Sequence, residues 1–141
     1  MREAIRWLRI AYWAGAIVDL AAGAQMLWPP LFAFGAGLEG FAPGADYRYA
    51  MDMGASLMFG WAALLVWADR KPVERMGVLP LTVFPVIAGL ALAEAGGVAS
   101  GFLPLARAAP IWIVQAALSA LFLGAHRNAR RALRAAARSV G

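Results

Sequence analysis

The stretch that decides the fold is Tyr47–Lys71, YRYAMDMGASLMFGWAALLVWADRK, an apolar run with a carboxylate near its start and a charged cluster at its end. The 19 residues from Tyr49 to Trp67 would be roughly 28 Å long as an α-helix, which matches the hydrocarbon core of a bilayer. A membrane-spanning helix is therefore predicted here.

The periodicity of this helix predicts which side faces the protein. Asp52, Ser56, Gly60 and Ala63 fall on one side. A carboxylate is costly in hydrocarbon, and small residues allow a neighbouring helix to approach closely. We therefore expect this stripe to face the interior of a bundle. The opposite side is expected to face lipid, and it carries Met53, Leu57, Met58, Trp61, Leu64 and Leu65.

The composition extends this prediction to the whole chain. Of 141 residues, 62% are hydrophobic and only 15% are charged, which is typical of a polytopic membrane protein. We predict an all-α membrane protein with a single domain, 1–141, that contains four transmembrane helices in an antiparallel bundle. The apolar runs that form these spans are about 5–28, 49–67, 76–95 and 110–125.

Several kinds of site are excluded by residue type. The chain has no cysteine and one histidine, His126, so a thiolate site or a multi-histidine metal site within one chain is impossible. We expect no metal and no cofactor. The net charge of +5 does not indicate nucleic acid, because the basic residues lie beside apolar runs, where they set topology and contact anionic headgroups.

The basic residues also predict an orientation. All of the 13 Lys and Arg residues except Arg48 and Arg107 fall on one side of the predicted spans. The positive-inside rule then places both termini in the cytoplasm of a multi-pass protein of the cell (inner) membrane. A basic tail, 127–140, is predicted to form a cytoplasmic amphipathic helix on anionic lipid. Its arginines are Arg127, Arg130, Arg131, Arg134 and Arg138.

The first and third predicted spans also contain residues that predict local structure. In the first, Tyr12 and Asp19 share a side with Gly15 and Gly23, a spacing that allows close helix contact around a buried carboxylate. In the third, Pro80 and Pro85 predict a kink with freed carbonyls near Met76 and Leu81.

Polar side chains gather in the outer, non-cytoplasmic half of the predicted bundle. We therefore predict a polar ligand-binding pocket that opens outward, with Asp19 as its principal residue. Structural roles also remain open for these residues. Asp52 can form an ion pair with Arg48, and amide side chains often form hydrogen bonds between helices. The candidate ligand-binding residues are Asp19, Asp52, Glu94, Gln115, Tyr12, Ser56, Ser119 and Trp112.

The segment YRYAMDMGASLMFGWAALLVWADRKPVERMGVL, Tyr47–Leu79, resembles segments of short bacterial four-span membrane proteins of unknown activity. A looser similarity is to the four-helix bundles of the sterol-isomerase and sigma-2-receptor type. In those bundles, acidic residues from different helices face a lipophilic amine or carbocation. This resemblance implies such a role for Asp19 and Asp52. Small multidrug exporters are similar in architecture alone, with four spans and an acid in the first.

Three functions remain open at this stage. The first is binding or transport of a small amphipathic or cationic molecule. The second is an enzyme acting on a lipid or isoprenoid, with Asp19 and Asp52 as an acid/base pair. The third is a structural or accessory subunit, including a homo-oligomer joined through small-residue stripes.

Overall fold

The computed structural model describes residues 1–138, and helices form nearly all of this part. The elements in order are α1 (Arg2–Leu27), α2 (Pro29–Ala36), α3 (Ala45–Asp69), α4 (Val78–Leu81), the π-helical segment η1 (Thr82–Ile87), α5 (Ala88–Ala99) and α6 (Leu105–Arg138).

Four helical segments are long and apolar enough to cross a membrane, namely Arg2–Leu27, Ala45–Asp69, Val78–Ala99 and Leu105–Arg138. This confirms an all-helical fold with four candidate spans. The predicted tail begins inside α6, which continues without a break to Arg138. Ser139 and Val140 of that tail lie outside the described residues.

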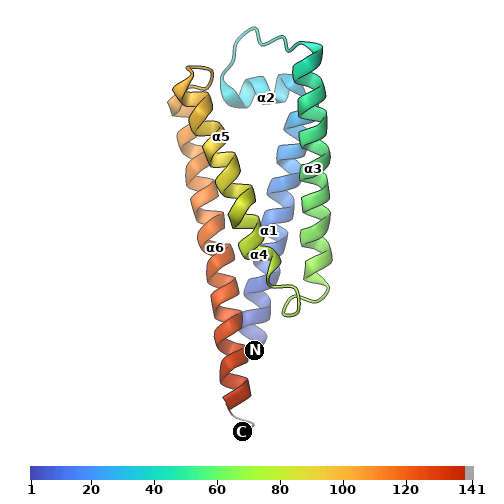
Figure 1. The fold of residues 1–141 in the computed structure, drawn as a ribbon, viewed down its shortest axis with the longest axis vertical. Helices are drawn as coiled ribbons and strands as arrows, with labels where there is room; N and C mark the ends of the chain where they lie inside the picture. Colours follow the sequence, from blue (N-terminus) through green and yellow to red (C-terminus); the bar gives the residue numbers. More distant parts are fainter. Residues whose placement is uncertain (139–141) are drawn as a thin grey trace.

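The helices form two pairs, α1 with α3 and α5 with α6 (Figure 1). The start of α1 and the end of α6 lie at the same end of the molecule, which we call the terminal end, and α2 lies across the opposite end, the α2 end (Figure 1). The two pairs approach each other near the terminal end and diverge toward the α2 end. Direct packing between them therefore belongs mainly to one half of the molecule.

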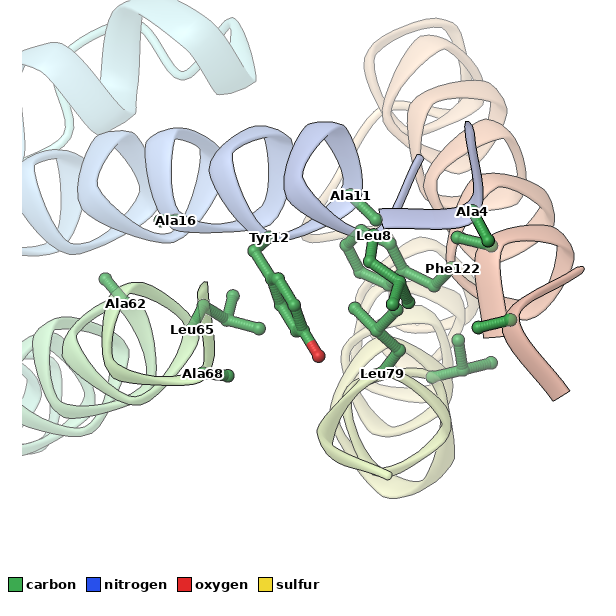
Figure 2. Close-up of a cluster of buried hydrophobic side chains, with 13 residues drawn as sticks. Ala4, Leu8, Ala11, Tyr12, Ala16, Ala62, Leu65, Ala68, Leu79 and Phe122 are labelled. Atoms are coloured by element: carbon green, nitrogen blue, oxygen red, sulfur yellow. The ribbon is translucent and has the colours of Figure 1, made fainter. Parts of the chain in front are cut away.

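The hydrophobic core lies in that half. It combines the start of α1 (4–16), the end of α3 (62–68) and the part of α6 around Phe122, with Leu79 from α4 (Figure 2). Tyr12 crosses this core from α1, and its ring lies between Leu65 and Leu79 (Figure 2). By contrast, no residue of α5 is buried.

The connection between α3 and α4 is fastened to the neighbouring helices. The Tyr12 hydroxyl donates to the carbonyl of Pro72 at 3.0 Å, and His126 Nδ1 donates to the carbonyl of Met76 at 3.1 Å. The Met76 carbonyl, four residues before Pro80, was predicted to be freed, but it also accepts the Leu79 N–H at 3.3 Å. The bonds from Tyr12 and His126 hold the loop against α1 and α6.

The predicted kink in the third span is confirmed. Phe84 leaves helical geometry, with φ −126° and ψ 108°, immediately before Pro85. Thr82 lies beside the break, where its hydroxyl accepts the indole N–H of Trp61 at 3.1 Å. This bond joins α3 to the kinked span.

The expected orientation of α3 is wrong. Asp52, Ser56, Gly60 and Ala63 are exposed, so this stripe does not face the interior of the chain. The buried positions are Ala55, Ala62, Leu65 and Ala68, and Leu65 had been expected to face lipid. The reason is that α3 packs mainly on α1, so only one side of α3 is covered by the chain.

The α2 end is bridged by aromatic contacts. Phe41 lies in the connection between α2 and α3, and its ring centroid is 5.3 Å from that of Tyr47 and 6.3 Å from that of Phe102. Phe102 belongs to the connection between α5 and α6. Arg107 also lies against Gly37, whose φ of +69° favours glycine. The α2 segment thus contacts both helix pairs.

Candidate functional site

Asp19 is the buried carboxyl group of the first span. Only 8% of the residue is exposed, and its Oδ2 is sealed from solvent without a hydrogen-bond partner. Buried polar atoms are nearly always hydrogen-bonded, and an unpaired carboxylate in hydrocarbon is costly. The Oδ1 atom also makes no hydrogen bond among residues 1–138, yet it is not sealed. The carboxyl group therefore reaches the molecular surface through Oδ1.

Two glycines allow side chains of neighbouring helices to pack closely on either side of Asp19. A Cβ atom placed on Gly15 would lie 2.8 Å from Leu65 and 2.9 Å from Phe122, and one on Gly23 would lie 2.7 Å from Phe59. Large side chains of α3 and α6 thus pack directly on the backbone of α1, one turn before and one turn after Asp19. The buried stripe expected on α1 is confirmed at these positions.

A second polar group joins α5 to α6. Gln115 Nε2 donates to both carboxylate oxygens of Glu94, at 3.0 and 3.2 Å. The Trp112 indole lies beside the same carboxylate. Two atoms of this group are buried without a hydrogen-bond partner, Trp112 Nε1 and Gln115 Oε1. Because the Trp112 indole already interacts with Glu94, Gln115 Oε1 is the atom of this group that still lacks a partner within residues 1–138.

The two polar groups lie in the same half of the molecule. Phe122 contacts α1 at Gly15. Asp19 is one turn, about 6 Å, beyond Gly15 toward the α2 end, and Gln115 is two turns, about 10 Å, beyond Phe122 in the same direction. Gln115 and Phe122 also share a face of α6, because seven residues complete nearly two turns. Asp19 and Gln115 thus lie where the two pairs diverge.

Other candidate residues are not brought to this region. Tyr12 lies in the core two turns nearer the terminal end, bonded to Pro72. Asp52 and Ser56 are exposed on α3, where the Ser56 hydroxyl donates to the Asp52 carbonyl. Asp52 makes no ion pair with Arg48 among the described residues.

Ser119 is half-buried one turn from Gln115 and makes no hydrogen bond within residues 1–138. It remains close to the site without a defined contact. Phe122 was missed by the sequence analysis, because its role depends on which spans pack together and no pattern in the sequence reports that pairing.

The arrangement does not provide an acid/base pair. Met26 packs against Gly54, and Phe59 packs against Gly23, so Asp52 lies beyond both contacts, roughly 15 Å along the axis from the level of Asp19. The described residues also contain no cluster of three His, Cys, Asp or Glu side chains that could hold a metal ion.

The chemistry that the site can perform is recognition. Asp19 and Gln115 each offer an unsatisfied acceptor, and most of the other residues of the spans are apolar. Such a set suits a molecule with a polar or cationic head and an apolar body.

Comparisons of the chain with protein-family models, with curated proteins and with solved structures find no match.

Proposed function

We propose that this chain is a multi-pass membrane protein with both termini in the cytoplasm, and that the half facing away from the cytoplasm binds a small amphipathic molecule with a cationic head. The observation that carries the proposal is the buried, unpaired Oδ2 of Asp19. An ionisable group inside a membrane span usually marks a path or a site for an ion or a substrate.

The binding mode follows from the two polar groups. Asp19 binds an ammonium or guanidinium group, since a paired charge is much less costly in hydrocarbon than an isolated one. Gln115 Oε1, which has no partner within residues 1–138, accepts a hydrogen bond from the same molecule. Its apolar body lies between the diverging helix pairs, where it replaces lipid chains.

An equilibrium binding measurement tests this proposal. The probe is 4-phenylbutylamine, which carries an ammonium group at neutral pH, and the uncharged comparison is 4-phenylbutanol. The full chain is placed in nanodiscs of phosphatidylcholine, with empty nanodiscs as background. We expect saturable binding of the amine and at least about tenfold weaker binding by Asp19→Asn, because the paired charge is lost.

The matched control is Glu39→Gln, which removes one carboxylate at an exposed position of the connection between α2 and α3. This variant should bind as the unaltered chain does. The proposal fails if the amine does not bind saturably, if the alcohol binds equally well, or if Asp19→Asn leaves the affinity unchanged.

A further inference from the structure

A shallow hollow lies on the outer surface of α1 near the terminal end, remote from Asp19. Its volume is about 440 Å³, and its lining comes entirely from one exposed stripe of α1. The lining residues are Arg2, Ile5, Arg6, Arg9, Ile10 and Trp13.

The basic side chains of this hollow are largely free. Arg2 and Arg6 make no ion pair or hydrogen bond within residues 1–138. Arg9 Nε lies 3.6 Å from Asp69 Oδ1, with 59% of the Arg9 side chain exposed, and Trp13 Nε1 donates to Asp69 Oδ2 at 3.4 Å. Asp69 thus holds Arg9 and Trp13 at the edge of the hollow and leaves the two other guanidinium groups unpaired.

The polarity of the hollow changes along the helix axis. Arg2 and Arg6 lie at its end nearest the terminus, whereas Ile10 and Trp13, which are 43% and 50% exposed, lie farther into the span. α1 has 26 residues and is therefore about 39 Å long, roughly 9 Å longer than the hydrocarbon core. Its first residues therefore extend beyond the hydrocarbon core, whereas Trp13, which is bonded to Asp69 at the end of α3, lies nearer to the boundary of the core.

This gradient matches a phospholipid that stands upright in the adjacent leaflet. We propose that the hollow is a binding site for one anionic phospholipid. Its phosphate is held between the guanidinium groups of Arg2 and Arg6, and one acyl chain lies along Ile10 and Trp13. Guanidinium groups bind phosphate through paired hydrogen bonds, and basic residues near a membrane surface attract anionic lipid.

A second hollow provides a comparison within the same chain. It lies between α1 and α6 and is lined by uncharged residues, namely Trp7, Ala120, Leu121, Gly124, Ala125 and Asn128. It has no basic group to pair with a phosphate. The proposed lipid site is also independent of the proposed function, because it lies at the opposite end of the molecule and uses none of the same residues.

Native mass spectrometry of the full chain tests the site. The protein in detergent is mixed with equal amounts of phosphatidylglycerol and phosphatidylcholine of distinguishable mass and similar chains. We expect the unaltered chain to retain phosphatidylglycerol over phosphatidylcholine by at least about tenfold. In Arg2→Gln/Arg6→Gln the ratio should fall to near one. Both arginines are exposed, and the helical content of the variant is checked by circular dichroism.

Two controls separate a site from diffuse attraction. Arg48→Gln/Arg107→Gln removes the same charge from exposed positions at the α2 end and should preserve the preference. An excess of glycerol 3-phosphate, a headgroup without chains, should not displace the lipid. The proposal is overturned if the unaltered chain shows no preference, if the Arg48→Gln/Arg107→Gln variant loses it equally, or if glycerol 3-phosphate competes.

Discussion

At the scale of single residues, Gly15 determines how closely the two helix pairs meet. The absence of a side chain allows Leu65 of α3 and Phe122 of α6 to contact the backbone of α1 at the same level. Both of these side chains are fully or almost fully buried, so neither has free space into which it can move. The contact of three helices therefore depends on this one glycine.

A substitution at Gly15 should destabilise the fold. Gly15→Val places atoms within contact distance of Leu65 and Phe122, and overpacking of this kind typically costs about 1–3 kcal/mol. We expect a lower midpoint of thermal unfolding in detergent. The matched control is Gly60→Val on α3, where a Cβ atom would have no neighbour within 4 Å. Equal effects of the two substitutions would contradict this role of Gly15.

The residue scale also shows what could be predicted about the site. The spacing of Gly15, Asp19 and Gly23 was sufficient to predict a buried carboxyl group, because glycines one turn away on either side allow close packing on one face. For Glu94 and Gln115, the sequence predicted only that two polar side chains lie at a similar depth in the bundle. The geometry of their contact depends on the pairing of α5 with α6, which the sequence does not encode in a readable pattern.

At the scale of elements, α3 shows why the orientation of a span can be mispredicted. Both sides of this helix carry small residues, Gly60 and Ala63 on one and Ala55 and Ala62 on the other. The prediction used Asp52 to choose between them, on the argument that a carboxylate avoids lipid. Asp52 lies near the α2 end, where no other helix covers that side of α3. Whether a second copy of the chain covers this stripe stays a prediction.

The α2 segment contacts the second helix pair through Phe102 as well as through Arg107. Phe102→Ala removes the ring that packs on Phe41, and aromatic pairs contribute about 0.5–1.5 kcal/mol. We expect amides of residues 29–44 to exchange with deuterium up to about tenfold faster. Phe34→Ala is the control, because Phe34 is 82% exposed and has no ring partner within the described residues. Unchanged exchange in Phe102→Ala would show that other contacts hold the segment.

At the scale of the whole molecule, the number of candidate spans and the kink near Pro85 could be predicted, because both depend on local composition. The divergence of the two pairs could not, because it results from where large side chains meet. The core is concentrated around Leu8, Leu65 and Phe122. Nearer the α2 end, few buried apolar side chains lie between the two helix pairs.

The proposed orientation can be tested because the chain has no cysteine. Ser100→Cys places a thiol in the connection between α5 and α6, and Glu74→Cys places one in the connection between α3 and α4. A membrane-impermeant maleimide added to intact cells should label the first variant only, because the basic connection remains in the cytoplasm. Labelling of the second variant alone would invert the orientation, and labelling of both would contradict a four-span topology.

The contact among Gly15, Leu65 and Phe122 has a mechanical consequence. This contact lies at the middle of α1, and the tip of α1 at the α2 end lies about 18 Å beyond it. By simple geometry, a relative rotation of about 10° would move that tip by about 3 Å. A small change in side-chain volume at this contact would therefore change the distance between the two helix pairs at the α2 end by a larger amount. The polar residues there would not need to change.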